Sequence, residues 1–230
     1  MSVDICVPIH NALPYVKRCL AAICGHTLKP FRLILHDDAS DPETAAWLET
    51  MARAHDGPIV LLRSDAQVWF TTSVNRCLTR CTADWIAILN SDVEIQDAHW
   101  AEKFQAVYDE DPNAGLLGAA DSIYVEGPPY VAEGKVQGHL WFLRGDRLRT
   151  VGKLGEREPA EVHIRSDDAW SAKFRLLGFT NYYLTNVRHV HGGESHPGGG
   201  ASWNRDLGKL PKWIDVVHAR NKPPRVLVEK

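Results

Sequence analysis

The sequence predicts an α/β fold built on a mostly parallel central sheet. Short apolar runs, typical of buried strands, alternate with segments whose apolar residues recur every three or four positions, which is typical of helices. The run Trp85–Leu89 is almost unbroken and bounded by polar residues, as expected of a strand buried on both faces of a parallel sheet. This run and Phe31–His36 are each followed by carboxylates, and in open α/β sheets ligands bind beyond the carboxyl ends of the strands.

The first half of the chain is expected to alternate strands and helices. The expected strands are Val3–Pro8, Phe31–His36, Ile59–Leu62 and Trp85–Leu89. The expected helices are Leu13–Ile23, a helix from Pro42 onward, and Thr71–Cys81. Asp41 or Ser40 is the expected N-cap of the second helix, because both side chains accept hydrogen bonds from first-turn N–H groups and a proline is tolerated there.

The second half becomes irregular after one further helix and strand. A helix is expected at Asp97–Tyr108 and a fifth strand at Ala114–Ala120. Beyond these we expect strands at His139–Leu143 and Asn181–Thr185, a helix at Asp167–Leu177 and a glycine-rich loop from His189. Since no linker separates the parts, residues 1–230 are expected to form a single domain with a regular half (1–95) and an irregular half (96–230).

The composition argues against several classes of protein. A net charge of -3 gives no global basic field, so no nucleic-acid partner is expected. The five cysteines are odd in number and no spacing is typical of a zinc site, so reduced thiols in a cytoplasmic protein are expected. No apolar run approaches the ~20 residues of a membrane span, and no signal peptide opens the chain. Any membrane association is therefore expected to be peripheral, at the cytosolic face.

Four clusters of chemically active side chains stand out. They are Asp37-Asp38, Asn90-Ser91-Asp92, Asp167-Asp168, and the pair His189 and His191. A carboxylate beyond a strand end suits a divalent cation and a phosphorylated ligand, because Mg²⁺ and Mn²⁺ take oxygen ligands and often share them with phosphates. Each cluster alone could also be a turn or a helix N-cap, where Asn, Ser and Asp are favoured. Their recurrence, twice at one expected sheet edge, favours a binding site.

The order and spacing of these clusters resemble the family 2 glycosyltransferases of the GT-A fold, over most of residues 3 to 195. Asp37–Ser40 is similar to the nucleotide-binding DDGS stretch of that family, and Leu89–Ile95 to its metal-binding DxD region. Asp167–Phe179 resembles the ED motif that carries the catalytic base, with its helix and closing Gly-aromatic pair. Val3–Asn11 resembles the opening strand with its Pro and Asn, and His191–Gly193 the late His-Gly-Gly.

The resemblance implies a Rossmann-like α/β/α sandwich and an inverting sugar transfer, with a role in polysaccharide biosynthesis. The donor would be a UDP-, GDP- or dTDP-linked hexose or deoxyhexose, and the acceptor a hydroxyl of a glycan or lipid-linked molecule. A divalent Mn²⁺ or Mg²⁺ would stabilise the leaving diphosphate, and one carboxylate base would deprotonate the acceptor. Residues 1–95 would bind the nucleotide-sugar, whereas residues 96–230 would supply the acceptor side and the base.

The resemblance also assigns roles to individual residues. His10 would stack on the base, Asp38 would bond the base edge and Ser91 would lie near the ribose. Asp92 would bind the metal, together with His191. Asp167 would be the general base, and Asp168 is a close rival because a shift of one residue in the alignment exchanges them. The donor-binding set implied in this way is Pro8, His10, Asp37, Asp38, Asn90 and Ser91.

Three departures from the family pattern affect these expectations. Asn90 stands at the first DxD position, and a neutral amide is a weaker metal ligand than a carboxylate. Val68 and Trp69 replace a small Leu-Gly pair, a change that would reshape the donor pocket. Ser166 precedes Asp167 where an acidic residue is frequent.

Two other functions remain as alternatives. A catalytically silent GT-A-like module would bind glycan or nucleotide without transfer, and nucleotide binding with and without Mn²⁺ is the first measurement that bears on it. A sugar-nucleotide nucleotidyltransferase would need a Gly-rich, basic loop after the first strand to hold a triphosphate, and Ile9–Ala12 offers none.

Overall fold

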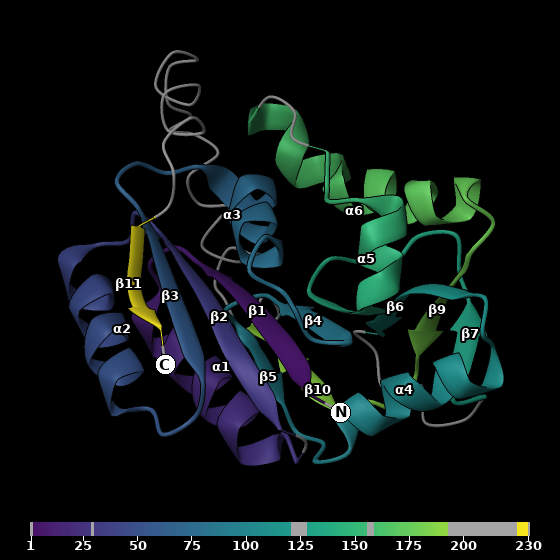
Figure 1. The fold of residues 1–230 in the computed structure, drawn as a ribbon, viewed down its shortest axis with the longest axis horizontal. Helices are drawn as coiled ribbons and strands as arrows, with labels where there is room; N and C mark the ends of the chain where they lie inside the picture. Colours follow the sequence, from purple (N-terminus) through teal and green to yellow (C-terminus); the bar gives the residue numbers. More distant parts are fainter. Residues whose placement is uncertain (1, 29, 121–127, 156–158, 193–224, 230) are drawn as a thin grey trace.

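The computed structural model describes residues 2–28, 30–120, 128–155, 159–192 and 225–229. They form a nine-stranded sheet with the strand order β11-β3-β2-β1-β4-β8-β6-β9-β7, and a separate two-stranded sheet of β10 and β5. Figure 1 shows the large sheet lying between two layers of helices. The described residues therefore have the α/β/α architecture that the sequence predicted.

The large sheet is mostly parallel. Its core strands point the same way and comprise β1 (Val3–Ile9), β2 (Phe31–Asp38), β3 (Ile59–Ser64), β4 (Trp85–Leu89), β6 (Ala114–Ala119) and β9 (Thr180–Leu184). The antiparallel strands are β7 (Tyr130–Ala132), β8 (Leu140–Arg144) and β11 (Arg225–Glu229). The small sheet pairs β5 (Val93–Ile95) with β10 (His189–His191).

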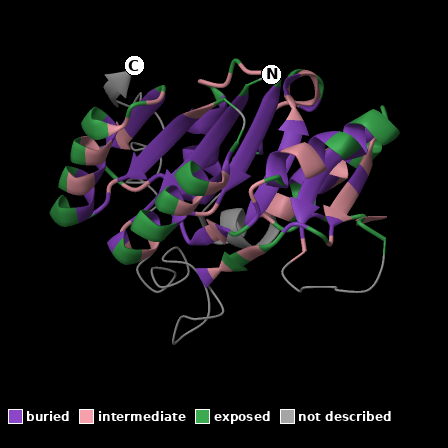
Figure 2. Ribbon diagram, turned by 90° about the horizontal axis from the view of Figure 1, so that it is seen from below, coloured by how far each residue is buried: buried purple, intermediate pink, exposed green. Residues whose placement is uncertain are grey.

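Helices cover both faces of the sheet, and most of them bury one side. One face packs against α1 (Leu13–His26), α2 (Pro42–Ala54) and α4 (Trp100–Glu110). The other packs against α3 (Trp69–Leu78), α5 (Gly145–Val151) and α6 (Pro159–Leu176). In contrast to the others, every residue of α3 is buried. Figure 2 shows the buried strands between helices whose outer sides are exposed. Because β1 and β4 are apolar on both faces, they form the centre of the core.

The structure moves several boundaries that the sequence predicted. β2 continues through Asp38, so the two aspartates end the strand instead of following it. α4 begins at Trp100 and not at Asp97, because the Asp97 side chain accepts from the N–H of His99 at 3.0 Å and closes a turn before the helix. The glycine-rich segment was expected to be a loop from His189, yet His189–His191 is a strand. The rest of that segment, 193–224, lies outside the described residues.

Among the described residues, no helix is both long enough and apolar enough to span a bilayer.

Candidate active site

The polar clusters after β2 and β4 lie at one edge of the sheet. β1 separates the two strands and is parallel to both, with Ile9 opposite Asp37 and Cys6 opposite Ile88. Neighbouring strands lie about 4.8 Å apart, so β2 and β4 run about 10 Å apart on either side of β1. We call the edge at which these strands end the carboxyl edge. It brings the Asp37-Asp38 and Asn90-Ser91-Asp92 clusters together, as the sequence predicted.

Asp37 shapes the turn that follows β2. Its Oδ1 accepts the backbone N–H of Ser40 at 2.9 Å, and its Oδ2 lies 3.1 Å from Nη1 of Arg63. The carboxylate is almost completely buried. Asp37 is thus engaged by the protein itself, and its predicted contact with the donor stays a prediction.

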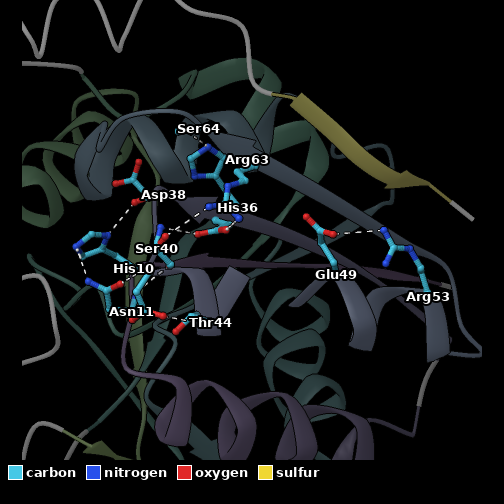
Figure 3. A network of polar contacts seen from close by, with 12 residues as sticks. His10, Asn11, His36, Asp38, Ser40, Thr44, Glu49, Arg53, Arg63 and Ser64 are labelled. Atoms are coloured by element: carbon cyan, nitrogen blue, oxygen red, sulfur yellow. Dashed lines mark hydrogen bonds and ion pairs between the residues drawn. The ribbon is translucent and has the colours of Figure 1, made fainter. Parts of the chain in front are cut away.

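Asn11 joins the ends of β1 and β2. Its backbone N–H donates to Oγ of Ser40 at 2.9 Å, and its Oδ1 accepts the N–H of Asp41 at 2.7 Å. Asp41 in turn caps α2 by accepting the N–H of Thr44 at 2.8 Å, which decides between the two caps that the sequence allowed. Figure 3 shows Asn11, Ser40 and Thr44 within this polar network.

Asp38 lies inside the protein, at the N-terminus of α3. Its Oδ1 accepts the N–H of Val68 at 2.7 Å, and its Oδ2 accepts the N–H of Trp69 at 2.9 Å. Burial raises the pKa of the Asp38 carboxyl to about 7, against the opposing effect of these two N–H donors. In this arrangement both oxygens already accept main-chain hydrogen bonds. That Asp38 bonds the edge of the base remains a prediction.

Trp69 occupies a backbone conformation that is unusual for a residue with a side chain. Its φ is 67°, in the left-handed region where glycine is favoured. Its side chain is fully buried and packs in the core on the α3 face of the sheet. The indole therefore contributes to the core, and the expected reshaping of the donor pocket stays a prediction.

His10 is held in one tautomer. Its Nδ1 lies 2.8 Å from the carbonyl oxygen of Asp38, which can only accept, so Nδ1 carries the proton. Its Nε2 is then free to accept from Nδ2 of Asn11 at 3.1 Å. The ring is 7% exposed. His10 thus borders the carboxyl edge without presenting a wide face to solvent, and its predicted stacking on a base is untested.

A second histidine, His36, lies on β2 behind the carboxyl edge. Burial and the nearby Arg76 lower the pKa of His36 to about 3, so the ring is neutral. Its Nε2 accepts from Nη1 of Arg76 at 3.3 Å, and its Nδ1 donates to Oγ of Ser73 at 2.6 Å. Arg76 also donates to Ser64 and lowers the pKa of the Asp38 carboxyl. No pattern in the sequence indicated this buried cation beneath the edge.

The turn after β4 places Asp92 against the second half of the chain. The N–H of Val93 donates to the Asn90 carbonyl at 3.1 Å, which reverses the chain into β5. β5 pairs with β10, with Val93 opposite His191. As a result Nε2 of His191 lies 3.5 Å from Oδ1 of Asp92, a carboxylate that is 4% exposed. The structure therefore brings together the two residues predicted to bind the metal.

Gly192 makes this approach possible. Its N–H donates to the carbonyl of Asp92 at 2.8 Å. A Cβ at this position would lie 3.0 Å from Cβ of Asp92 and 3.0 Å from Cδ1 of Tyr15. Glycine therefore lets the end of β10 lie close to Asp92, where a Cβ would be tighter than ordinary van der Waals contact.

Two further histidines join His191: His189, which the sequence grouped with it without assigning it a role, and His139, which was not predicted to be part of the site. The rings of His139 and His191 are stacked with centroids 4.8 Å apart, and those of His139 and His189 with centroids 5.0 Å apart. His139 directly precedes β8, and its carbonyl accepts the N–H of Asn90 at 2.9 Å. The alternation of His189 and His191 was a usable signal, because residues i and i+2 of a strand share a face. Nothing in the sequence pattern indicated His139.

Asp167 and Asp168 lie on α6 and share one cation, Lys135. Its Nζ is 2.9 Å from Oδ1 of Asp168 and 3.7 Å from Oδ2 of Asp167. The Asp167 side chain is 21% exposed and that of Asp168 is 48% exposed. Burial raises the pKa of the Asp167 carboxyl, whereas Lys135 lowers it. Asp167 is thus the less solvated and less tightly paired of the two.

The chain segment 135–139 connects these carboxylates to the carboxyl edge. Lys135 contacts both of them, and His139 contacts Asn90 and His191. Four residues of extended chain span at most about 14 Å. The carboxylates of α6 are therefore linked to the carboxyl edge by a short stretch of chain, and their joint action at one site stays a prediction.

Residues 4–166, more than half of the chain, match the family described as Glycosyl transferase family 2. The chain belongs to this family.

Solved glycosyltransferase structures share its fold. A mannosyltransferase, PcManGT from Pyrobaculum calidifontis in complex with GDP-Man and Mn2+, aligns over 82% of this chain and 56% of its own, with a TM-score of 0.67 and 18% identity. TarS 1-349 from S. aureus aligns over 84% of this chain and 61% of its own, with a TM-score of 0.65 and 15% identity. TarS 1-349 in complex with UDP-GlcNAc gives a TM-score of 0.64 and 15% identity, over 82% of this chain and 57% of its own. The fold is GT-A.

One curated relative also matches this family 2 chain. An uncharacterized protein of Mycobacterium tuberculosis (strain CDC 1551 / Oshkosh) is 28% identical over 90 residues, which cover 39% of this chain and 27% of the relative. The aligned part thus spans about a quarter of the curated relative and less than two thirds of the solved structures.

The residues of this family 2 chain fit a divalent ion at Asp92. Two ligands that bind one ion at about 2.1 Å, at angles of 90° to 110°, lie about 3.0 to 3.5 Å apart. The 3.5 Å between Nε2 of His191 and Oδ1 of Asp92 lies in that range. In the described part of the chain, Oδ1 of Asn90 is buried without a hydrogen-bond partner. No three His, Cys, Asp or Glu side chains there form a complete metal cage, so diphosphate oxygens would have to complete the coordination.

Proposed function

We propose that this family 2 protein is an inverting glycosyltransferase that moves a sugar from a nucleoside-diphospho-sugar to a hydroxyl of a glycan or lipid-linked acceptor. The observation that carries the proposal is the pairing of Asp92 with His191 at the carboxyl edge. In a GT-A fold this edge is where the ends of β1, β2 and β4 meet. A buried carboxylate beside an imidazole suits an ion that a diphosphate shares.

The donor would lie along the carboxyl edge. Pro8 lies near the end of β1 and His10 directly follows the strand; both would border the base, while Asp37 and Asp38 hold the loop around it. Ser91 lies between Asn90 and Asp92 and would be near the ribose. The complexes of PcManGT with GDP-Man and of TarS with UDP-GlcNAc make GDP- and UDP-linked hexoses the first donors to test, with dTDP-linked sugars next.

Asp92 and His191 would hold Mn²⁺ or Mg²⁺, and Asn90 could add its amide oxygen. When bound, the ion supplies positive charge at the diphosphate, whose negative charge grows as it leaves. The protein residues do the rest of the positioning: Gly192 lets His191 approach, and β10 holds it against Asp92.

Asp167 would be the general base, with Asp168 holding Lys135 beside it. A single displacement with inversion needs one group that takes the proton of the attacking hydroxyl. Asp167 has the less solvated carboxyl, and burial raises its pKa, which makes it the better proton acceptor near neutral pH. Asp168 is bound more closely by Lys135, at 2.9 Å.

A thermal-shift experiment tests the proposal. The protein is melted with UDP, GDP or dTDP, with and without Mn²⁺, and a nucleotide at 100 times its Kd should add about 2.7 kcal/mol of stability. Asp92→Ala should lose the shift that depends on Mn²⁺. Asp167→Asn should keep the shift and lose sugar transfer. No shift with any nucleotide would contradict the proposal, whereas a shift without transfer from any donor would favour a catalytically silent module.

A further inference from the structure

The three histidines at Asp92 form a continuous stack whose hydrogen-bond directions can be assigned. Nδ1 of His189 lies 3.2 Å from the carbonyl oxygen of Val187. A carbonyl only accepts, so Nδ1 of a neutral His189 carries the proton and its Nε2 is an acceptor. Nε2 of His139, 3.0 Å from Nε2 of His189, is then the donor. The carbonyl of Val187 thus fixes the tautomer of His189. His189 in turn fixes which nitrogen of His139 carries the proton.

His139 in turn covers one face of His191. The two rings are 21° from parallel, and His139 is 3% exposed, so its ring has little freedom to move. His191 is therefore held between the ring of His139 and Asp92, with its Nε2 at 3.5 Å from the carboxylate. Residues behind a metal ligand that fix its orientation typically change metal affinity by about 10- to 100-fold when they are replaced.

An oriented imidazole also affects which ion is preferred. Mg²⁺ takes oxygen ligands, whereas first-row transition ions accept imidazole nitrogen and bind N/O sites in the order Mn²⁺ below Co²⁺. Asp92 and the diphosphate would serve either class of ion equally. The nitrogen ligand is therefore the component of this site that makes its affinity differ between Mg²⁺ and the transition ions.

We propose that His139 and His189 are positioning residues that hold His191 toward the ion, so that replacing either one lowers the affinity for Mn²⁺ or Co²⁺ more than the affinity for Mg²⁺. The inference rests on the proposed function, because the ion is expected to bind together with a nucleoside diphosphate.

The test measures ion affinity in place of sugar transfer. The full chain is incubated with UDP or GDP, free Mn²⁺ is followed by its electron paramagnetic resonance signal, and Mg²⁺ is added as a competitor. The wild type should bind Mn²⁺ at least about tenfold more tightly than Mg²⁺. Co²⁺ bound to the wild type should show the visible absorption of a nitrogen-ligated ion.

Variants of His189 distinguish a loss of the positioning of His191 from a general disruption of the fold. His189→Phe removes the acceptor for His139, and Mn²⁺ affinity should fall by about tenfold or more while Mg²⁺ affinity stays within about threefold. His189→Gln supplies a carbonyl acceptor and should restore most of the preference. His26→Phe, at the last turn of α1, is the matched control and should change neither affinity. If His189→Phe does not fold, His139→Phe makes the same comparison, because it keeps a ring and loses the N–H.

The outcomes that overturn the inference differ from those that overturn the function. An unchanged Mn²⁺-to-Mg²⁺ ratio in the His189→Phe or His139→Phe variant, or a parallel loss of both ions, would refute the role of the stack while ion-dependent nucleotide binding persists. If the wild type bound no nucleotide at all, the result would instead contradict the proposed function itself.

Discussion

The backbone N–H of Trp69 donates to Oδ2 of Asp38 across 2.9 Å, although the two residues lie 31 positions apart. The neighbouring N–H of Val68 donates to Oδ1 of the same carboxylate at 2.7 Å. The first N–H groups of a helix have no partner within the helix, and its N-terminus favours negative charge. The end of β2 is thereby tied to the start of α3, at the edge where the donor is proposed to bind.

This buried carboxylate should make stability depend on pH. Burial raises the pKa of Asp38 to about 7 in the folded protein, compared with about 3.9 in an unfolded chain. Between these values the folded state binds more protons, so the stabilisation from this group is present at low pH and is lost as pH rises toward 7. Asp38→Asn removes the titration and keeps the shape. The stability of the wild type relative to this variant should fall by about 2 to 3 kcal/mol between pH 5 and pH 8.

Urea unfolding of both proteins at the two pH values measures this difference. Other titrating groups are common to wild type and variant, so they cancel in the comparison. An equal difference at pH 5 and pH 8 would show that Asp38 does not titrate in this range.

The pairing of Lys135 with Asp167 and Asp168 predicts a change in the pH dependence of transfer. Lys135 lowers the pKa of the Asp167 carboxyl. Lys135→Met should therefore raise that pKa, and because a base must be ionised to act, the acidic limb of the kcat/KM profile should move to higher pH. Lys153→Met is the control, because Lys153 is exposed and its Nζ bonds to Thr79 at 2.9 Å instead.

The measurement is kcat/KM for the best donor from pH 5 to pH 9 in wild type and both variants. An acidic limb that stays in place in Lys135→Met would mean that Asp167 is not the group whose titration limits the reaction.

The regular half of the fold was predictable because its signals are local. β4 has the predicted bounds, and α1 and α2 begin at the predicted residues, Leu13 and Pro42, because apolar spacing and a proline are read within a few positions. The short strand β5 was not predicted. It holds three residues and exists through its pairing with β10, almost a hundred positions later, which no local pattern encodes.

The contrast between local signals and long-range pairing also explains which site residues the sequence did not predict. Motif order indicated Asp92 and His191, and the structure brings them together. His139 reaches His191 only because β8 inserts antiparallel between β4 and β6, and that strand order depends on packing of the whole sheet. Likewise, the capping of α3 by Asp38 joins residues whose spacing carries no helix-cap signal.

The close approach of Gly192 to Asp92 predicts a sensitive position. In Gly192→Ala the new methyl group would lie 3.0 Å from Cβ of Asp92 and 3.0 Å from Cδ1 of Tyr15, which is tighter than ordinary van der Waals contact, so we expect β10 to shift away. His191 moves with it, and the thermal shift that requires both nucleotide and Mn²⁺ should fall by half or more. Gly155→Ala is the matched control, because its Cβ meets nothing within 4 Å. A full Mn²⁺-dependent thermal shift in Gly192→Ala would show that His191 is not needed for ion binding.

The left-handed backbone of Trp69 sets two effects against each other. Trp69→Gly relieves a positive φ that costs a residue with a side chain about 1 to 2 kcal/mol. It also deletes a fully buried indole, and removing a buried aromatic side chain costs about 3 to 5 kcal/mol. Packing should outweigh strain, so Trp69→Gly should lower the free energy of unfolding by about 1 to 4 kcal/mol in urea titrations. Ala39→Gly, at a φ of 54°, removes only a methyl group and should change stability by less than about 1 kcal/mol. If Trp69→Gly is as stable as the wild type, the indole adds no packing energy beyond the strain that its backbone imposes.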